Sequence, residues 1–419
     1  MTTETKHTKA FCKTDVPERW RLSLLGELGT FSKGKGILKE QVISEGLPCI
    51  RYGEIYTTHD FIIKNFKSYI TEEVAKNSKE IKSGDILFAG SGETVEEIGK
   101  AVAYLGNEKA YAGGDVIILS TEKDVFPEFL SYILEADFVR RQKRVLGQGN
   151  SVVHIYSSDL SKIKIPLPPL PEQKAIAQVL STWDKAIHQT EQLITQKEQG
   201  KKWLMQQLLT GKKRLKGFEG EWKFTAISNL FKPVNRYVDW NESELYHLIS
   251  IRRRNGGVFF RDPLFGHQIG VKKLKTVLRN DFVISKRQVS HGGWAIIESD
   301  FNNAKVSDEY DCLEIADNKI ITADFWRWYC QIPILTHYAN VDSDGVHIEK
   351  SIFDYDLFKR RKVLIPSTIE EQTAIAQVLQ AAENEINLLK AKAEKLREQK
   401  KGLMQVLLTG KVRVRNFEN

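Results

Sequence analysis

The sequence predicts an α+β protein in which two mixed globules alternate with two long helices. Residues 172–212 and 371–411 align without a gap at an offset of 199 residues, and 19 of their 41 positions are identical. Both segments have the hydrophobic spacing of a long helix, whereas the regions before them, 15–165 and 222–365, contain short β-rich runs separated by turns. A repeat of this period is too long for a solenoid, whose units span about 20–50 residues.

The composition is that of a globular protein. Of the 419 residues, 41% are hydrophobic and 28% are charged, and the length suffices for two or three domains. No run of about 18 apolar residues predicts a membrane span, and the polar N-terminus lacks the apolar centre of a signal peptide. The four cysteines lie far apart and match neither a zinc site nor a disulfide framework. We therefore expect a reducing, cytoplasmic location.

Each repeated helix carries a sustained heptad pattern. Hydrophobic steps of four and three alternate from Ile176 to Leu208 in the first copy and from Ile375 to Leu407 in the second. The simplest partner for one copy is the other copy in the same chain, which gives an intramolecular coiled coil; a coiled coil between two chains is the alternative. The predicted seam residues are Leu180, Ile187, Ile194, Leu204, Leu208, Leu379, Ile386, Leu389, Leu396, Leu403 and Leu407.

Local signals predict where these helices begin and end. Thr368 and Glu371 have the spacing of a capping box at the start of the second copy. Gly211 and Gly410 are placed to terminate the two helices in the left-handed conformation. About forty residues at 1.5 Å each give a rod of about 60 Å.

A lysine recurs inside the predicted seam of both copies. Lys201 and Lys400 occupy the same position of the heptad frame. A polar residue there costs stability but fixes the register of the two helices.

The two globules open in the same way. Each begins near a tryptophan flanked by charged residues, Trp20 in the first and Trp222 in the second. Each then mixes short β-rich runs with turns. The clearest runs are residues 85–88, 116–119, 281–284 and 295–297.

The two globules also end in the same way. An apolar, aromatic helix is predicted at 127–145 in the first and at about 323–339 in the second. Segments 163–168 and 363–366 follow and are predicted to be extended. Their prolines prevent the next long helix from starting within them. We therefore predict a tail at 1–14, a first globule at 15–165, a helix and linker at 166–221, a second globule at 222–365, and a helix and tail at 366–419.

The sequence stops where a third globule would begin. Residues 216–220 (KGFEG) lead into the second globule, whereas the similar residues 415–419 (RNFEN) are the last of the chain. This predicts a closed, pseudo-twofold molecule whose termini lie near each other.

The positive charge is concentrated in one segment. The net charge is +8, and residues 252–288 contain ten Lys or Arg against two acidic residues, which accounts for the whole excess. A concentrated patch of this kind suits a polyanion such as nucleic acid. A solvated surface face is the plainer alternative.

No segment supplies a convincing catalytic site. Residues 29–35 (GTFSKGK) have the spacing of a P-loop, but Gly36 stands where a hydroxyl should hold Mg²⁺, so a basic loop or a plain turn is favoured. Residues 88–92 (FAGSG) resemble a glycine-rich S-adenosylmethionine loop, but the base-holding [DN]-P-P-[FYW] motif is missing, so we predict a turn between strands. We find no clustered carboxylates for a nuclease and no nucleophile elbow, and we assign no metal ligand.

What remains is contact chemistry. Arg and Lys recognise guanine, Asn and Gln recognise adenine, and more than half of protein–DNA hydrogen bonds go to phosphate and sugar. The candidate DNA-binding residues are Lys33, Lys35, Arg51, Tyr52, Gln148, Asn150, Ser151, Arg252, Arg253, Arg254, Asn255, Lys286, Arg287, Gln288 and His291.

Several segments together carry a family resemblance. They are PPLPEQ at 168–173, AIAQVL and LMQQLLTGK after it, their second copies within 369–411, the openings at Trp20 and Trp222, KSGDILF at 82–88, and CIRYGE at 49–54. With these segments the chain resembles the DNA-specificity subunit of type I restriction–modification systems, over essentially its whole length. The second copy departs from the proline-rich lead-in and has STIE at 367–370, a change at a helix start.

The resemblance implies a division of labour. Two target-recognition domains would each read one half of a split, asymmetric DNA site, and the two helices would pair antiparallel and hold the domains a fixed distance apart. This chain would need no cofactor. Two methyltransferase subunits would bring S-adenosylmethionine and adenine-N6 methylation, and restriction subunits would bring ATP- and Mg²⁺-dependent translocation and cleavage. The alternatives are a stand-alone DNA adenine methyltransferase using residues 88–92, and a coiled-coil adaptor without a DNA role.

Overall fold

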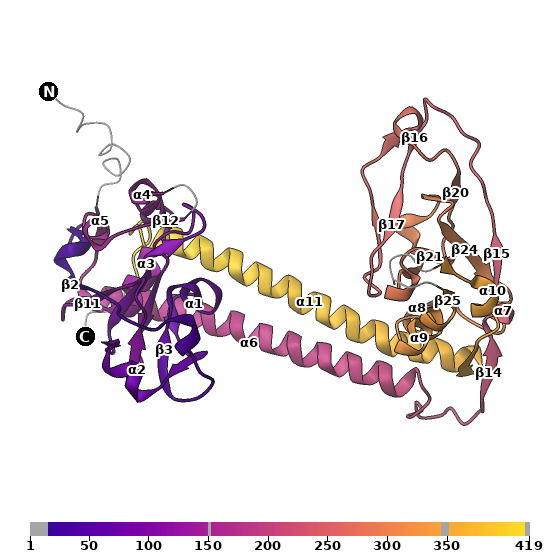
Figure 1. Ribbon diagram of the computed structural model, residues 1–419, viewed down its shortest axis with the longest axis horizontal. Coiled ribbons are helices and arrows are strands. Elements are labelled where there is room, and N and C mark those ends of the chain that lie inside the picture. The colour runs from indigo at the N-terminus through magenta and orange to yellow at the C-terminus, as the bar shows by residue number, and fades with distance from the viewer. Residues whose placement is uncertain (1–15, 150–151, 345–351, 415–419) are drawn as a thin grey trace. The chain divides into compact units, whose positions relative to one another are not determined.

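The chain forms two compact units in this computed structural model. Unit 1 comprises residues 1–190 and 392–419, and unit 2 comprises residues 191–391. Each unit contains one globule and parts of both long helices, α6 (Leu170–Leu208) and α11 (Ile369–Leu407), which lie side by side (Figure 1). The structure describes residues 16–149, 152–344 and 352–414.

A five-stranded sheet forms the centre of unit 1. Its strands are, in spatial order, β2 (Gly29–Lys33), β11 (Val116–Thr121), β7 (Asp85–Ala89), β9 (Ala101–Tyr104) and β4 (Ile62–Ile63). Only the β4–β9 pair is parallel among these neighbours. All five residues of β7 are buried, as expected for a strand that is covered on both faces.

A second sheet and several short elements complete the globule of unit 1. The sheet consists of β5 (Ser68–Ile70), β3 (Leu47–Ile50), β10 (Ala110–Ala112) and β6 (Lys79–Ile81) in that order. Two strand pairs lie outside it, β1 (Arg21–Leu24) with β13 (Lys164–Leu167) and β8 (Ser91–Gly92) with β12 (Val153–His154). The short helices are η2 (Leu25–Glu27), η3 (Lys39–Gln41), α1 (Tyr52–Thr57), α2 (Glu72–Lys76) and α5 (Ser157–Leu160).

The prediction of one helix at 127–145 was wrong. The chain forms two helices, α3 (Pro127–Leu134) and α4 (Asp137–Leu146), because Ala136 adopts an extended conformation with φ −66° and ψ 145°. The break turns Glu135 inward, where its carboxylate accepts a hydrogen bond from the Ala101 amide (3.0 Å) and pairs with Lys143 Nζ (2.9 Å). Both members of this pair are buried, so the break serves an interior ion pair that a continuous helix would not form.

Unit 2 is built on a smaller, fully antiparallel sheet. Its strands are, in order, β15 (Phe231–Val234), β24 (Tyr310–Ile315), β21 (Phe282–Ser285) and β22 (Trp294–Ile296). Two-strand pairs surround it: β14 (Trp222–Ala226) with β27 (Lys362–Pro366), β16 (Leu245–Tyr246) with β19 (Leu264–Phe265), β17 (Ile249–Ile251) with β18 (Val258–Phe260), β20 (Leu274–Thr276) with β23 (Lys305–Ser307), and β25 (Ser343–Asp344) with β26 (Ile352–Phe353).

The predicted helix at 323–339 is also two helices. They are α8 (Ala323–Tyr329) and α9 (Pro333–Val341). The correction has a local cause, because the residue before a proline avoids the helical conformation, and Ile332 accordingly has φ −75° and ψ 148°. The shorter helices of unit 2 are α7 (Ile227–Leu230), η4 (Gly266–Gln268), η5 (Val289–His291), η6 (Ser299–Phe301) and α10 (Tyr355–Phe358).

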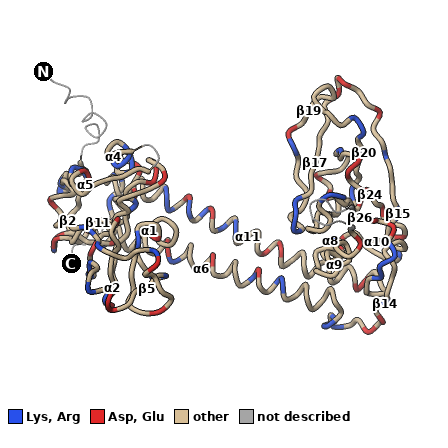
Figure 2. Tube along the Cα trace, in the orientation of Figure 1, with Lys and Arg blue, Asp and Glu red and all other residues tan. Residues whose placement is uncertain are grey.

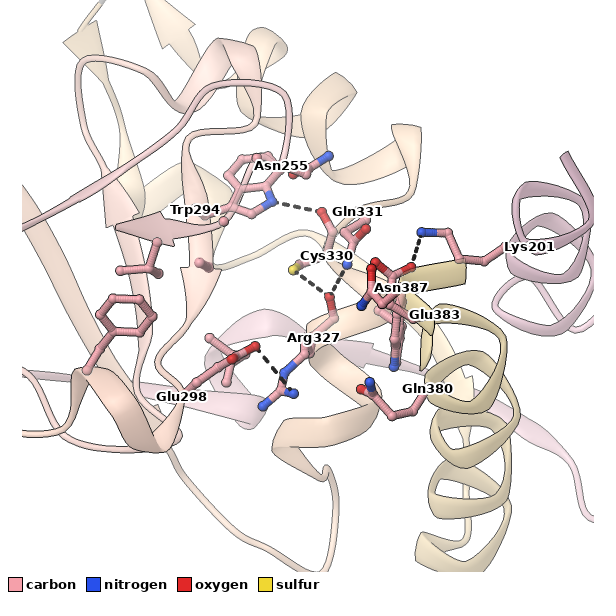
Figure 3. A pocket seen from close by; sticks show the side chains of 17 residues that line it. Lys201, Asn255, Trp294, Glu298, Arg327, Cys330, Gln331, Gln380, Glu383 and Asn387 are labelled. Atoms are coloured by element: carbon pink, nitrogen blue, oxygen red, sulfur yellow. Dashed lines mark hydrogen bonds and ion pairs between the residues drawn. The ribbon is translucent and has the colours of Figure 1, made fainter. Parts of the chain in front are cut away.

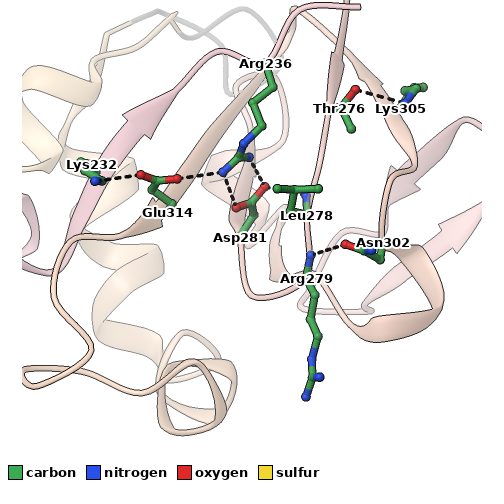
Figure 4. A network of polar contacts seen from close by, with 9 residues as sticks. All are labelled: Lys232, Arg236, Thr276, Leu278, Arg279, Asp281, Asn302, Lys305 and Glu314. Atoms are coloured by element: carbon green, nitrogen blue, oxygen red, sulfur yellow. Dashed lines mark hydrogen bonds and ion pairs between the residues drawn. The ribbon is translucent and has the colours of Figure 1, made fainter.

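A charged network fixes the strands of unit 2 to one another. The guanidinium of Arg236, which follows β15, donates to Asp281 (2.7 Å) and to Glu314 (2.8 Å), as Figure 4 shows. Glu314 also pairs with Lys232 (2.9 Å). Burial raises the pKa of Asp281, while the Leu278 amide and Arg236 oppose that shift. The network therefore joins β15, β24 and the start of β21.

The start of α6 is held by the end of α11 in unit 1. Glu172 accepts hydrogen bonds from Trp20 Nε1 (2.9 Å) and from Arg413 Nε (2.5 Å). Arg413 follows α11, so the two helices run in opposite directions in this unit. The tryptophan that opens the globule therefore contacts the first turn of the repeated helix.

Unit 2 repeats this arrangement at the start of α11. Glu371 accepts hydrogen bonds from Trp222 Nε1 (3.3 Å) and from Arg214 Nε (2.5 Å). The predicted capping box is only half present: Thr368 Oγ1 accepts from the Glu371 amide (3.4 Å), but the Glu371 carboxylate bonds to Arg214 instead of returning to the Thr368 amide.

The glutamine beside each of these glutamates secures the globule to the helix. Gln173 donates from Nε2 to the carbonyls of Asp124 (3.0 Å) and Pro168 (2.9 Å), and its Oε1 accepts from the Phe126 amide (2.7 Å). The Glu-Gln pair therefore contacts both its own lead-in strand and the segment before α3. Gln372 makes the corresponding contacts with Ile320 O (2.8 Å), Pro366 O (3.1 Å) and Thr322 N (2.9 Å).

The repeated helices are packed along the predicted heptad positions. All eleven predicted seam residues are buried or half-buried; Leu180 and Leu379 are fully buried. Gly211 and Gly410 follow the helices with φ 70° and 69°, the left-handed conformation predicted for a terminating glycine. Among the described residues, no helix is both long and apolar enough to cross a membrane.

Candidate nucleic-acid interface

The turn between β17 and β18 presents three adjacent arginines. We call Arg252–Gly257 the arginine turn; its Arg252, Arg253 and Arg254 side chains are exposed. Two backbone hydrogen bonds hold it against a neighbouring loop, from the Arg254 amide to His291 O (2.6 Å) and from the Asn255 amide to Gly292 O (3.1 Å). The structure therefore brings the candidates at 252–255 together with His291.

The other candidates of unit 2 follow β21. Lys286 Nζ lies 3.3 Å from Asp311, and Arg287 Nε lies 2.7 Å from Glu309. The Glu309 hydrogen bond raises the pKa of Arg287 above its usual value. Gln288 sits at the start of η5, and its carbonyl accepts from the His291 amide (3.0 Å).

Much of the basic segment at 252–288 is neutralised within unit 2. Figure 2 shows acidic and basic residues interspersed through this globule. Asp308 pairs with both Lys273 (2.8 Å) and Lys275 (3.0 Å), and hydrogen bonding from Lys273 lowers the pKa of Asp308 to about 2. Lys272 pairs with Glu242 (2.8 Å).

The arginine turn differs from these neutralised positions. Within the described ranges, Arg252, Arg253 and Arg254 make no ion pair. The Arg279 backbone amide donates to Asn302 (2.9 Å), and its guanidinium extends away from the other residues drawn in Figure 4 as a single charge. The positive charge available to a polyanion is therefore densest on the arginine turn.

A cavity of about 520 Å³ borders the arginine turn (Figure 3). Asn255 lines it, and its Oδ1 has no hydrogen-bond partner among the described residues. Lys201 of α6 and Glu383 of α11 also line it and pair at 2.5 Å. Burial raises the pKa of the lining thiol, Cys330, to about 12, so this group is a protonated thiol and a poor nucleophile.

Four candidates of unit 1 lie in two segments that are hydrogen-bonded to residues 112–114. Lys33 ends β2, and the Lys35 amide donates to the carbonyl of Ala112 (3.1 Å) in the segment 112–114. Arg51 precedes α1, which begins at Tyr52, and the Gly113 amide donates to the carbonyl of Ile50 just before them (2.9 Å). The acidic neighbours are Asp115 for Lys33 (4.0 Å) and Glu54 for Arg51 (3.4 Å).

Residues 29–33 are a strand, which corrects the predicted loop or turn. They pair residue by residue with β11 as β2. Gly34 follows, and a Cβ at this position would lie 1.9 Å from the carbonyl oxygen of Gly113. The glycine at position 34 is therefore required by close approach of two backbones, a packing role unrelated to phosphate binding.

The turn predicted between strands at 88–92 is present but confined to Gly90. Phe88 and Ala89 belong to β7 and Ser91 and Gly92 to β8, with a bend only at Gly90. The Gly90 amide donates to Asp115 O (2.8 Å), and its carbonyl accepts from the Ile155 amide (3.0 Å). These backbone groups are already bonded within the fold, which argues against a cradle for S-adenosylmethionine.

The remaining candidates of unit 1 lie near β12. Gln148 forms an antiparallel bridge with His154, with backbone hydrogen bonds of 2.9 and 2.7 Å. Asn150 and Ser151 lie outside the described residues. Within the described part of the chain, no group of three or more His, Cys, Asp or Glu gathers as a metal site.

Sequence reasoning missed two residues that shape the arginine turn. The Arg252 guanidinium lies 4.3 Å from the ring centroid of Phe259, and Gly292 provides the space beside Asn255. The Asn-Gly step at 255–256 between two β-rich runs was an available hairpin signal that pairs position 252 with the following strand. No local signal indicated Gly292, because its contact is 37 residues away in the sequence.

Comparison with known proteins shows similarity to one family. Residues 17–199 match the family described as Type I restriction modification DNA specificity domain. The chain is 23% identical to the type I restriction enzyme MjaVIII specificity subunit of Methanocaldococcus jannaschii, over 96% of this chain and 95% of that protein. It is 28% identical to the type I restriction enzyme EcoKI specificity subunit of Escherichia coli, over 52% and 48%.

A solved structure shares the fold. The S subunit of a type I restriction–modification system from M. genitalium superposes with a TM-score of 0.56 at 14% identity, covering 94% of this chain and 96% of that one. At this identity the match speaks for the fold alone.

Proposed function

We propose that this chain is a DNA-specificity subunit of a type I restriction–modification system and that it reads a bipartite, asymmetric DNA site with a fixed, unspecified spacer. The match of residues 17–199 to that family and the similarity to two specificity subunits support the proposal. Subunits of this family are non-catalytic, and the reaction is carried out by partner subunits. This chain selects the DNA sequence.

One observation supports the proposal that the two globules recognise different half-sites. The Glu-Gln pair at the start of each long helix makes the same contacts in both units, whereas the globules differ in their sheets. Among the described residues, unit 1 has sheets of five and four strands and two separate strand pairs, whereas unit 2 has a sheet of four strands and five separate strand pairs. A constant scaffold with divergent globules supports recognition of two different half-sites.

The long helices support the proposal of a fixed spacer. We propose that they form an antiparallel, intramolecular coiled coil, because the predicted seam residues are buried or half-buried and charged pairs such as Lys197–Glu385 (2.7 Å) and Lys390–Glu198 (2.6 Å) cross between them. Two DNA-binding globules on one stiff connector bind cooperatively, because the second binding event becomes intramolecular.

We further propose two methyltransferase subunits as partners. The scaffold occurs twice, so a surface that binds such a subunit in one unit has a counterpart in the other. These subunits would supply S-adenosylmethionine binding and adenine-N6 chemistry. Restriction subunits would supply ATP- and Mg²⁺-dependent translocation and cleavage.

Reconstitution tests the division of labour. We expect the purified chain alone to methylate no DNA and to bind no S-adenosylmethionine, and to direct methylation once a methyltransferase subunit is added. Mapping of methylated adenines then reveals the site. Methylation by the chain alone would support a stand-alone methyltransferase instead.

Charge reversal tests the adaptor alternative. We expect replacement of Arg252, Arg253 and Arg254 by Glu to reduce DNA affinity strongly and to lower its salt dependence. Unchanged affinity would favour an adaptor without a DNA role. Exchange of residues 15–165 for the corresponding globule of a relative should alter one half-site only.

A further inference from the structure

The arginine turn has a strained backbone. It closes with hydrogen bonds from the Arg252 amide to Gly257 O (2.9 Å) and from the Gly256 amide to Arg253 O (3.2 Å). Arg254 and Asn255 both have positive φ, 58° and 55°. The left-handed conformation is unfavourable for a residue with a side chain, and glycine avoids that cost. An arginine at position 254 is therefore not explained by the needs of the turn.

The neighbouring loop is shaped to hold this turn. Besides the two backbone hydrogen bonds to His291 and Gly292, the Asn255 side chain packs against Gly292, where a Cβ would lie 2.9 Å from Asn255 Oδ1. Gly292 itself has φ 66°. The turn is thus held by contacts that do not involve its arginine side chains.

The arginine side chains are left available by this arrangement. The Arg252 guanidinium carbon lies 4.3 Å from the Phe259 ring centroid, a cation–π contact that involves no carboxylate. Arg253 and Arg254 are exposed, and no carboxylate of the described residues pairs with them. By contrast, Lys272 and Lys273 on the same globule are paired with acids.

Resting on the proposed function, we infer that the arginine turn reads a guanine in the half-site of unit 2, and that Gly292 and Asn255 are positioning residues for it. Arginine binds guanine through two parallel hydrogen bonds to O6 and N7 in the major groove, which requires a defined position and direction of the side chain. Binding to phosphate requires positive charge but little precision in side-chain geometry, because the phosphates repeat along the DNA backbone whatever the sequence. A strained, externally braced turn supplies the geometry that base reading requires.

The test uses the full chain assembled with its methyltransferase partner. Arg252, Arg253 and Arg254 are each changed to Lys, which keeps the charge but removes the planar fork. We expect at least one of these variants to lose about ten- to a hundredfold of its preference for guanine at one position of one half-site, measured by mapping methylated adenines. The other half-site should stay unchanged.

Two further variants sharpen the result. Gly292→Ala keeps every charge and should relax the same position, because the added methyl group displaces Asn255. Lys272→Ala removes an exposed but neutralised charge from the same globule and should leave the recognised sequence unchanged. The exposed Arg→Lys variants keep the test decisive if Gly292→Ala does not fold.

Two outcomes would overturn the inference. In the first, all three Arg→Lys variants recognise the wild-type sequence, and Arg→Ala variants weaken binding equally on all DNA sequences with a smaller dependence of affinity on salt. The turn would then contact phosphate and no base. If the wild-type half-site read by unit 2 contains no guanine, the turn reads no base of this kind. Failure of the proposed function is distinct, because the wild-type assembly would then yield no bipartite site at all.

Discussion

Lys400 Nζ lies 2.5 Å from Asp184 Oδ1 in unit 1, and this contact recurs 199 residues away as the 2.5 Å pair of Lys201 and Glu383 in unit 2. The offset is that of the helix repeat itself. The seam lysines, which on sequence grounds cost stability, therefore each face a carboxylate on the opposite helix.

An aromatic residue of each globule joins this pair. In unit 1 the Tyr132 hydroxyl donates to Asp184 (2.6 Å), and Lys400 Nζ lies 3.7 Å from the ring centroid of Phe61. Burial lowers the pKa of Lys400, although the Asp184 charge opposes that shift. In unit 2 Lys201 lies 5.8 Å from the Trp328 ring and borders the cavity. The pair in unit 1 is the more deeply enclosed of the two.

Removal of one partner should therefore affect the two units unequally. We expect Lys400→Met to destabilise unit 1 by about 3 kcal/mol, because it leaves a carboxylate in a largely buried site without its cation. Lys201→Met should cost less than about 1 kcal/mol, because its pair retains solvent contact. Native-state hydrogen exchange of α3 and α8 amides measures each unit separately. Combining Lys400→Met with Asp184→Leu should recover most of the loss, and equal losses in both units would refute the burial argument.

The glutamine of the Glu-Gln pair should matter more than other glutamines of α6. Gln173→Leu leaves the amide of Phe126 and two carbonyls without their partners in a buried place, so we expect a loss of about 3 kcal/mol in the free energy of unfolding. The exposed Gln178→Leu on the same helix is the matched control and should change little. Urea unfolding followed by hydrogen exchange in unit 1 distinguishes the two variants, and a loss no larger than the control's would contradict this role.

Acid should weaken unit 1 through His59. This side chain is buried, and burial, with Lys100 and Lys67 nearby, lowers its pKa from 6.5 to about 4. The unfolded chain then binds a proton at higher pH than the folded chain, so the stabilisation is complete above pH 6.5 and is lost as the pH falls toward 4, by roughly 3 kcal/mol in all.

The check is the pH dependence of stability in a variant. His59→Phe should flatten the unfolding free energy of unit 1 between pH 6.5 and 4, whereas His247→Gln, at an exposed position of unit 2, should preserve the slope. An unchanged slope in His59→Phe would mean that other groups govern the acid response.

Helix length should set the spacer of the DNA site. Insertion of one heptad after Gln192 and one after Ala391 keeps the seam in frame and adds about 10 Å of helix. We expect the unspecified gap to grow by about three base pairs, at 3.4 Å each, with both half-sites unchanged. Maps of methylated adenines provide the measurement. Altered half-sites with an unaltered gap would show that the helices do not set the spacing.

Local sequence signals predicted the ends of the long helices, but they did not predict the break within the helix expected at 127–145. Gly211 and Gly410 end the helices as expected, because a left-handed terminating residue is a local backbone preference. The break between α3 and α4 was missed because it accompanies an interior ion pair of Glu135 with Lys143, which no local preference indicates. The capping box was half right because Glu371 has a stronger partner in Arg214, 157 residues away.

The candidate site shows the same limit. Arg253 and Arg287 look alike in the sequence, yet one is exposed without an ion pair among the described residues and the other is bound to Glu309. Which charge is free depends on carboxylates delivered by other strands, so composition located the basic segment but not its available part.

The sequence by itself determined the repeated helices, their heptad frame and their ends, because these depend on spacing and on backbone preferences within a few residues. Tertiary structure alone decided that the seam lysines meet carboxylates at a 199-residue offset, that Glu172 and Glu371 hold the opposite helix, and that the arginine turn is braced at His291 and Gly292. The physical reason is that an ion pair or a brace requires two distant segments to be brought within about 3 Å, and no local preference specifies that meeting.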